Sequence, residues 1–376
     1  MIQHVPLEPI PSPSRGSGRQ GGAPFPPSMA QPSCSLPPDG SPIHPQIQPS
    51  PWDWQPATAA AAAWPVSLLQ LQGPDSLRFL HGQSSQAIEL ASPGQWLSTC
   101  CISPTARMRA LAEVLVSSDG AWLLLSSGDA SSVHQALDRV LFPADAVQLG
   151  SPQTGLLLAP VPEWGAEPLQ AGASRSWRPL EGAEGFWLGD QWLLLLDPAT
   201  AMREDQDLEA PARALLARPR LTTLEQERWR LQCGLPLWPQ ELSDDTNPFE
   251  LGLAPRVSLN KGCYVGQETL AKLATYDGVR RQLRRWWAQG PAERAAAFAP
   301  GTSLRQANGE RAGTITSSLH LTAADIWIGL ALVRRQALSQ ECLWSPVDAA
   351  ADDQGIALQI SRPPTFVEPP VGAGGG

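Results

Sequence analysis

The stretch Asn260-Lys261-Gly262-Cys263-Tyr264-Val265-Gly266-Gln267-Glu268 combines more special residue types than any other part of this 376-residue chain. It runs directly into residues 269–273, which are compatible with a helix. Asn260 is expected to cap that helix, and Gln267 and Glu268 then fall near its first turn. The N–H groups of the loop and the positive end of the helix dipole would face one small volume. Such a volume suits an anion or the polar edge of a ligand.

Individual residues of this stretch have both a functional and a structural interpretation. Gly262 and Gly266 permit a positive φ or a close backbone approach, although an ordinary tight turn uses glycine for the same reason. Cys263 lies two residues from the Lys261 ammonium and near a helix N-terminus, which favours the thiolate and makes the sulfur nucleophilic. A buried structural thiol is the alternative, because most lone cysteines are buried. Lys261 and Cys263 are therefore the candidate catalytic residues.

Apolar patterns elsewhere predict the surrounding elements. Strands are expected over residues 66–71, 95–102 and 109–116, a helix over 128–141 and a single strand over 187–196. Short β runs at even spacing near the C-terminal end favour a small barrel.

Taken as a whole, residues 261–268 resemble the K-G-C-Y-x-G-Q-E signature of the YgfZ family, folate-binding proteins implicated in the maintenance of iron-sulfur proteins. That family is related to the aminomethyltransferase, or T-protein, of the glycine cleavage system. Residues 75–85 and 225–238 resemble further family segments. In the turn over residues 103–108 the family usually has a Gly-Arg pair, and Ala106 replaces that glycine here. The resemblance covers about residues 64–360.

The resemblance implies an α+β fold, with an aminomethyltransferase-like folate-binding region in two parts and a C-terminal small β-barrel. We expect the first folate-binding subdomain over residues 59–220, the second over 221–285 with the signature, and the barrel over 286–362. Residues 1–58 are rich in Pro, Ser and Gly and are predicted to be disordered, because they cannot bury enough surface to offset their ordering entropy. Residues 363–376 are predicted to form a flexible tail.

The resemblance also implies tetrahydrofolate as cofactor. A Glu helps to hold the pterin in aminomethyltransferases, and the matching residue here is Gln232, which can give two hydrogen bonds but no charge. Trp238 and Phe249 could stack on a pterin or aryl ring, with a core position as the alternative. The predicted folate-binding residues are Tyr264, Gly262, Gly266, Gln267, Glu268, Gln232 and Trp238.

Six cysteines without C-x-x-C spacing predict neither a zinc site nor a complete cluster site within one chain, so no metal ligands are assigned. Adjacent Cys100 and Cys101 should point to opposite faces of a strand, with one of them buried. The net charge of −9 argues against general nucleic-acid binding, although the basic run from Arg280 to Arg285 could meet RNA. A solvated edge strand is the simpler interpretation of that run. Neither a membrane-spanning run nor a secretory signal is evident, which favours the cytoplasm.

The implied function is that of a tetrahydrofolate-binding accessory protein that supports the assembly or repair of iron-sulfur enzymes, including tRNA-modifying ones. Its expected partners are folate and iron-sulfur client proteins, with no direct nucleic acid and no membrane. The alternative is a folate-dependent aminomethyltransferase like the T-protein, whose chemistry relies on an acidic residue near the folate. The comparable stretch offers only Asp119 beside Gly120, a pair that suits a turn. An accessory factor is therefore favoured over a classical aminomethyltransferase, and enzymatic activity is left open.

Overall fold

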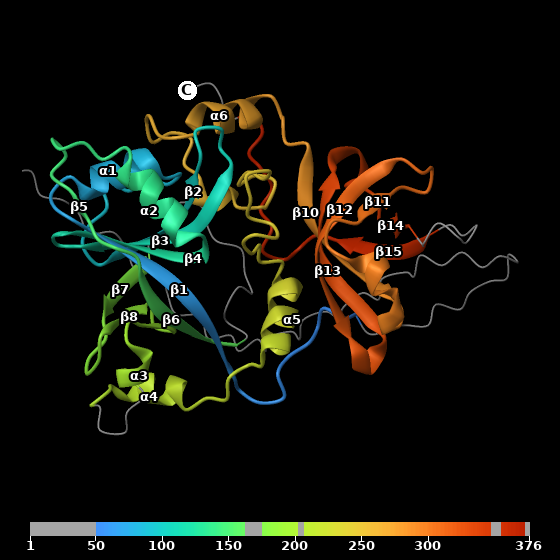
Figure 1. Cartoon of the computed structure of the whole chain (residues 1–376), viewed down its shortest axis with the longest axis horizontal. Helices are drawn as coiled ribbons and strands as arrows, with labels where there is room; N and C mark the ends of the chain where they lie inside the picture. Colours follow the sequence, from blue (N-terminus) through green and yellow to red (C-terminus); the bar gives the residue numbers. More distant parts are fainter. Residues whose placement is uncertain (1–49, 162–174, 202–206, 347–354, 373–376) are drawn as a thin grey trace, which may run out of the picture.

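The computed structural model describes residues 50–161, 175–201, 207–346 and 355–372. A sheet region and a closed barrel lie side by side, with helix α5 (Thr223–Cys233) between them (Figure 1).

The sheet region contains nine strands, all paired antiparallel. They are β1 (Ala61–Gln72), β2 (Gln95–Ile102), β3 (Met108–Ser117), β4 (Gly120–Gly128), β5 (Gln148–Leu149), β6 (Gln153–Pro160), β7 (Arg175–Pro179), β8 (Gly185–Leu188) and β9 (Trp192–Leu195). Their order is β4-β3-β2-β7-β8-β9-β6-β1-β5, and β1 pairs with β4 as well. The predicted single strand over 187–196 is wrong, because Gly189 has φ +62° and turns the chain between β8 and β9.

Four short helices cover this region. Helices α1 (Ser76–Gln83) and α2 (Ala130–Asp138) pack Phe79, Leu80, Val133 and Leu137 against apolar residues of β1, β3 and β4. Helices α3 (Pro198–Ala201) and α4 (Ala210–Leu216) follow β9, and α4 adds Ala212 and Leu215 to a second core. The helix predicted over 128–141 is present but shorter at both ends.

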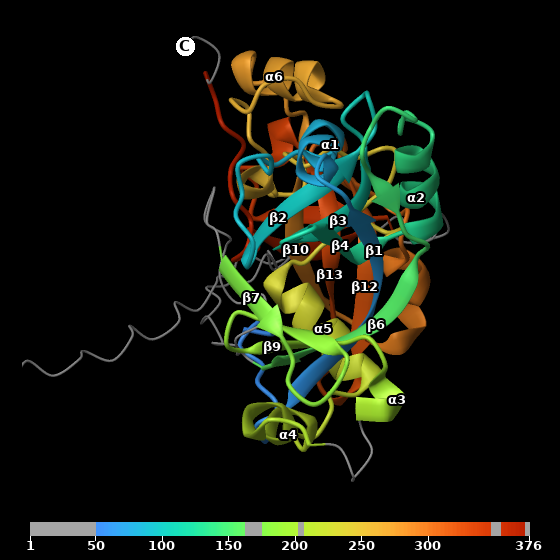
Figure 2. The same cartoon turned by 90° about the vertical axis from the view of Figure 1, so that its left-hand side faces the viewer.

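Helix α5 has both of its ends defined by local sequence. Thr222 and Glu225 form a capping box at its start, and Gly234 ends it in the left-handed conformation at φ +73°. After α5 the chain forms a long loop, which contains the short 3-10 helix η1 (Ala254–Arg256) and leads to helix α6 (Gln267–Thr275). Figures 1 and 2 show α5 and α6 well apart along the contact between the two regions.

The barrel closes in the order β10-β13-β12-β11-β14-β15. Its strands are β10 (Arg281–Gln289), β11 (Ser303–Arg305), β12 (Arg311–Leu321), β13 (Ile326–Arg334), β14 (Cys342–Ser345) and β15 (Ile356–Ser361), joined in part by η2 (Ala292–Phe298), η3 (Thr322–Ala324) and η4 (Arg335–Ala337). Trp286 and Phe298 stack at 5.5 Å between ring centroids in its core. The barrel therefore starts at Arg281, before the predicted boundary at residue 286.

Both predicted tails include packed residues. Trp52 is buried and its neighbour Trp54 is half-buried, so the part of residues 1–58 that the structure describes does not behave as a disordered tail. At the other end Phe366 is buried in the core that contains Tyr264, and Val367 forms a bridge with Leu253. In both tails a large apolar side chain gains enough free energy from burial to hold its neighbours in place. The prediction failed because it used the average composition of each segment.

Among the described residues, no helix is both long enough and apolar enough to cross a membrane.

Candidate functional site

The signature loop, residues 260–266, enters helix α6 through a glycine. Gly266 is the residue before the first turn and has φ +79°, so the predicted capping role of Asn260 is wrong. A Cβ at Gly266 would lie 2.8 Å from the Ser103 carbonyl oxygen and 2.9 Å from Ile102 Cδ1. The close approach of the loop to the turn after β2 thus requires glycine at this position.

The turn after β2 places an alanine in a backbone conformation that favours glycine. Ala106 is fully buried and has φ +59°, a region that costs a residue with a Cβ about 1–2 kcal/mol. Its N–H donates to the Ser103 carbonyl at 2.8 Å. A glycine would take this conformation without that penalty, so Ala106 forms the turn at some cost in free energy.

Lys261 attaches the signature loop to the end of α1. Its Nζ donates to the carbonyl oxygens of Ser84 at 2.7 Å and Gln86 at 2.8 Å, and also to that of His81. The ammonium lies 4.3 Å from the centroid of the Tyr264 ring, and burial lowers the pKa of Lys261 to about 7. Because the three carbonyls use all three N–H donors, Lys261 holds the loop and is not directed at Cys263 as predicted.

His81 completes the attachment from the opposite side. Its Nδ1 accepts the backbone N–H groups of Ile88 and Glu89 at 3.3 and 3.1 Å, which assigns the ring proton to Nε2. Nε2 then donates to the Lys261 carbonyl at 2.7 Å. Lys261 and His81 thus hold each other's main chain, a role for His81 that the sequence analysis did not identify.

Cys263 is exposed, whereas Cys100, Cys101 and Cys233 are buried. Burial raises the pKa of each of these three thiols to about 12, so they stay protonated at neutral pH. Cys100 and Cys101 contribute to different cores, as expected for opposite faces of β2, but both are buried because the two faces of that strand are covered. Of the four free cysteines described, Cys263 alone is open to solvent.

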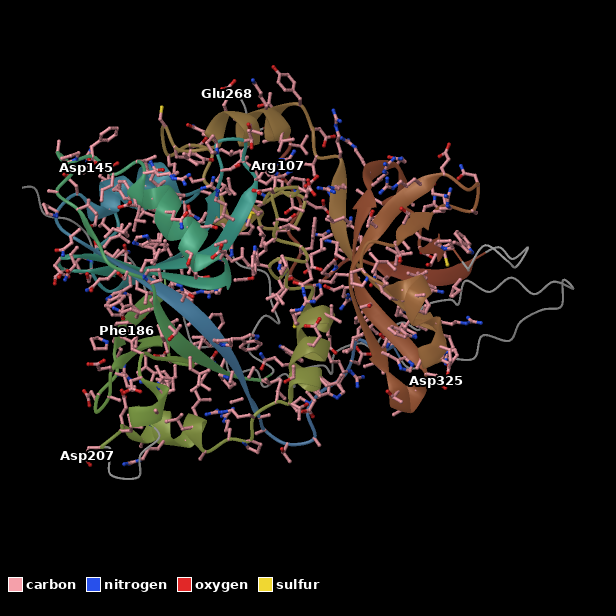
Figure 3. All side chains as sticks on the ribbon, in the orientation of Figure 1. Arg107, Asp145, Phe186, Asp207, Glu268 and Asp325 are labelled. Atoms are coloured by element: carbon pink, nitrogen blue, oxygen red, sulfur yellow. The ribbon has the colours of Figure 1, made fainter. Side chains whose placement is uncertain are left out.

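The remaining residues of the signature divide between interior and surface. Tyr264 is buried, and its hydroxyl has no hydrogen-bond partner among the described residues. Burial and the nearby Cys100 raise the pKa of that phenol. Gly262 is exposed with φ +92°, and Gln267 is half-buried. Glu268 lies on the outside of α6 (Figure 3), where it pairs with Lys272 at 2.6 Å.

Gln232, the predicted pterin ligand, lies on α5 and is already bonded at both ends of its amide. Its Oε1 accepts the N–H of Trp54 at 3.2 Å, and its Nε2 donates to the carbonyl of the same residue at 3.0 Å. Arg285 from β10 donates to the Gln232 main-chain carbonyl at 2.7 Å. We call the group formed by Gln232, Arg228 and Arg285 the α5 site.

The two aromatic residues considered for stacking on a pterin, Trp238 and Phe249, are not part of the α5 site. Trp238 is 45% exposed, and its main-chain N–H donates to Ser127 Oγ at 2.9 Å. Phe249 is buried in the apolar core with Tyr264, which agrees with the structural alternative given for it.

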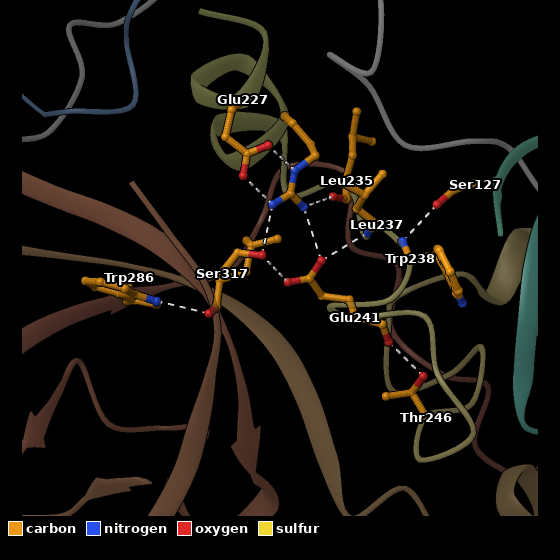
Figure 4. Close-up of polar contacts among 11 residues, drawn as sticks. Ser127, Glu227, Leu235, Leu237, Trp238, Glu241, Thr246, Trp286 and Ser317 are labelled. Atoms are coloured by element: carbon orange, nitrogen blue, oxygen red, sulfur yellow. Dashed lines mark hydrogen bonds and ion pairs between the residues drawn. The ribbon is translucent and has the colours of Figure 1, made fainter. Parts of the chain in front are cut away.

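A buried ionic network fastens the base of α5 to the barrel (Figure 4). Arg230 pairs with Glu227 at 2.7 Å and with Glu241 at 3.2 Å, and it donates to Ser317 Oγ of β12 at 2.9 Å. Ser317 in turn donates to Glu241 at 2.6 Å. Burial alone would lower the pKa of Arg230, but the two carboxylates outweigh it and the pKa is raised.

The basic run around β10 is largely used inside the molecule. Arg281 pairs with Glu250 at 3.0 Å, Arg284 lies over the Phe366 ring, and Arg285 lies over the Trp52 ring. The predicted solvated edge strand is wrong, because β10 pairs with both β13 and β15 in the closed barrel. These three side chains therefore do not form a basic surface for RNA.

The predicted site residues therefore form two groups rather than one. Lys261, Cys263 and Tyr264 belong to the signature loop, and Gln232 belongs to the α5 site. Within the described ranges, no three His, Cys, Asp or Glu residues are arranged to hold a metal ion.

Comparisons with known proteins find relatives over most of the chain. A chloroplast protein of Arabidopsis thaliana, named as a transferase, is 28% identical over 78% of this chain and 68% of its own length. The tRNA-modifying protein YgfZ of Edwardsiella ictaluri is 27% identical over 81% of this chain and 98% of its own. The mitochondrial iron-sulfur cluster assembly factor IBA57 of Mus musculus is 28% identical, covering 72% and 76%. The chain is a relative of the YgfZ proteins.

A solved structure shows the relation to the T-protein. Glycine cleavage system aminomethyltransferase T from Bartonella henselae superposes with a TM-score of 0.57 at 18% identity, covering 83% of this chain and 88% of that one. At this identity the match shows that the two proteins share a fold. No protein-family model matches the chain. The relatives named above are bacterial, chloroplast and mitochondrial proteins, so a cytoplasmic location stays a prediction.

Proposed function

We propose that this YgfZ relative is a tetrahydrofolate-binding accessory protein for the assembly or repair of iron-sulfur enzymes, including tRNA-modifying ones. The observation that carries the proposal is the exposed thiol of Cys263 on a loop that is otherwise anchored to α1. The names of two relatives, a tRNA-modifying protein and an iron-sulfur cluster assembly factor, support the same role.

The geometry of the loop suits a thiol that acts on another molecule. Lys261 and His81 fix the main chain on one side of Cys263, while the sulfur itself stays accessible. Ordering the backbone beforehand lowers the entropy lost when a partner docks. One thiolate can provide only one ligand to a cluster, so a client protein or a second chain must provide the others.

The α5 site is the better candidate for the folate. Gln232 offers one donor and one acceptor at the end of a buried side chain, which matches the polar edge of a pterin. Arg228 and Arg285 provide positive charge for carboxylates of the ligand, and their guanidinium groups, which already lie over aromatic rings, provide surfaces on which a flat ring can stack. Residues of the signature loop would then act near the thiol and would not contact the pterin.

Transferase chemistry of the T-protein kind has weaker support. Asp119, the acidic residue considered for it, lies in the turn between β3 and β4 and accepts the Ser117 hydroxyl at 2.9 Å. That contact stabilises the turn, so it gives Asp119 a structural role. A carrier protein loaded with an aminomethyl group, mixed with this protein and tetrahydrofolate, should yield no methylene-tetrahydrofolate. Formation of that product at an enzymatic rate would make the transferase the better assignment.

The accessory role is tested with Cys263→Ala in a strain that lacks its own YgfZ protein. We expect the variant to leave iron-sulfur enzyme activity low, while its affinity for 5-formyltetrahydrofolate by titration calorimetry stays that of the wild type. Lys272→Gln, an exposed change on α6 outside the motif, is the control and should restore activity. Full restoration by Cys263→Ala would remove the thiol from the mechanism. Absence of folate binding by the wild-type protein would remove the ligand.

A further inference from the structure

The α5 site is filled by the chain's own residues 50–55, which we call the strap. In Figure 1 the blue beginning of the described chain runs beside α5 on its way to β1. Pro51 and Trp52 are buried, Trp54 is half-buried, and Asp53 and Gln55 are exposed. The strap thus presents its apolar residues to the α5 site and its polar ones to water.

The contact between the strap and Gln232 has the hydrogen-bond pattern of a flat heterocycle. Trp54 presents its N–H and C=O side by side, and the Gln232 amide pairs with both, at 3.2 and 3.0 Å. A pterin has a ring N–H next to a ring carbonyl and presents the same donor and acceptor pair. Only one edge of the Gln232 amide presents its oxygen and an N–H side by side, so it cannot pair in this way with Trp54 and with a pterin at once.

Each of the two indole rings of the strap lies against an arginine of the α5 site. The Arg285 guanidinium is 4.7 Å from the Trp52 ring, and that of Arg228 is 5.2 Å from the Trp54 ring, which also meets Trp229 edge-on at 6.5 Å. Such contacts hold a ring in place without using the N–H donors of the arginine.

Three buried donors around the strap lack partners among the residues that the structure describes. They are the Nε atoms of Arg228 and Arg285 and the indole nitrogen of Trp52, which is 7% exposed. Buried N–H groups without acceptors are costly, so the strap fits the site less well than a ligand with matching acceptors would. Burial lowers the pKa of Arg285 to about 10, while Cys233 and Asp53 act in the opposite direction, so both guanidinium groups stay charged.

We infer that the strap is an intramolecular competitor of the ligand of the α5 site: residues 50–55 and tetrahydrofolate occupy Gln232, Arg228 and Arg285 in turn. This inference rests on the proposed folate function. Because the strap is part of the chain, its effective concentration is high and does not depend on dilution. Folate must displace the strap, which releases residues 50–55 to solvent as a signal that the site is loaded.

The first experiment needs no variant. Hydrogen exchange of the peptide that spans residues 50–58 is measured in the wild-type protein with and without saturating 5-formyltetrahydrofolate. Displacement predicts faster exchange in this peptide when the ligand is bound, while the peptide that contains residues 186–195 of β8 and β9 keeps its rate. Unchanged or slower exchange of residues 50–58 in a protein that demonstrably binds the ligand would overturn the competition.

The second experiment weakens the strap directly. The double variant Trp52→Ala/Trp54→Ala loses both ring contacts. Its dissociation constant for 5-formyltetrahydrofolate is expected to fall about tenfold. This is the change expected if the strap leaves the site open in about one tenth of wild-type molecules and in most molecules of the variant. Trp177→Ala, a half-buried Trp packed on Phe186 of β8, is the matched control and should bind with wild-type affinity. Thermal unfolding confirms that each variant is folded.

The outcomes separate the two proposals. Equal affinity of the double variant and the wild type would overturn the strap and leave the folate function standing. Weaker affinity of a folded double variant would show that the two Trp residues belong to the ligand site itself, which also overturns competition. Absence of binding by wild type, double variant and control would reject the folate function together with the strap.

Discussion

In the signature loop a buried lysine is used to hold backbone carbonyls, whereas at the α5 site two arginines are used to hold aromatic rings. The first arrangement is saturated with hydrogen bonds. The Lys261 ammonium donates to main-chain carbonyls at the end of α1, and His81 donates back to the Lys261 carbonyl. The second is unsaturated, because the Nε atoms of Arg228 and Arg285 have no acceptor within the described part of the chain. A saturated cluster stabilises one conformation, while an unsaturated one is suited to exchange its occupant.

The largest expected effect is at the base of the α5 site. Glu241→Ala would leave Arg230 and Ser317 without their shared carboxylate in a fully buried position. Loss of one partner of a buried ion pair costs about 3–5 kcal/mol, although Glu227 still compensates part of the charge on Arg230. Urea unfolding measures the change. Glu268→Ala, which removes an exposed pair, is the control and should cost less than about 0.5 kcal/mol. A similar loss for the two variants would contradict the importance of this network.

Two glycines of the signature loop allow a matched test of close packing. Gly266→Ala combines a positive φ with a Cβ 2.8 Å from the Ser103 carbonyl, and we expect a loss of about 2–4 kcal/mol. Gly262→Ala has a similar φ of +92° but no heavy atom within 4 Å of the new Cβ, so the conformational cost alone, about 1 kcal/mol, is expected. Chemical denaturation of both variants measures the difference. Equal losses would show that contact with the turn after β2 is unimportant.

The pH dependence of stability tests the buried Lys261. Its pKa is lowered by burial from 10.5 to about 7, so between these values the unfolded state binds more protons than the folded state. The free energy of unfolding of the wild type must then rise with pH across this interval relative to that of Lys261→Met, by at most about 1.4 kcal/mol per pH unit. Parallel pH profiles of the two proteins in urea would show that Lys261 titrates as a solvated lysine.

The smallest expected effect on stability is at Cys263. Cys263→Ala should change the free energy of unfolding by less than about 0.5 kcal/mol, because the side chain is exposed. Alkylation followed by peptide mass spectrometry sharpens the contrast with the interior. In the folded protein at mildly alkaline pH, Cys263 should react rapidly, while Cys100, Cys101 and Cys233 react only after unfolding. Rapid reaction of these three in the folded state would contradict their burial.

Several features of the fold could be predicted because they depend on neighbouring residues. The capping box at Thr222 and Glu225 and the stop at Gly234 are local signals, and α5 begins and ends where they place it. The split of residues 187–196 into β8 and β9 was missed because Gly189 breaks a run whose apolar pattern is continuous.

The candidate site was harder to predict, because its partners are remote in sequence. Lys261 and His81 are 180 positions apart, and Gln232 and Trp54 are 178 positions apart. His81 lies in a segment matched to the family without a role of its own, and Trp52 and Trp54 were placed in a predicted disordered tail. Only the apolar pair of Trp residues in a Pro-rich segment could have signalled that this part of the tail packs.

The sequence by itself determined the relationship and the chemistry that is present: a signature with one thiol between two glycines, a neutral amide where a relative has a carboxylate, and turns that require a left-handed residue. The tertiary structure decided how those groups are used. It directed the Lys261 ammonium to the end of α1 and left Cys263 exposed, and it placed the chain's own Trp54 on Gln232. The physical reason is that hydrogen bonds are satisfied by whichever groups the fold brings together, and sequence distance does not specify them.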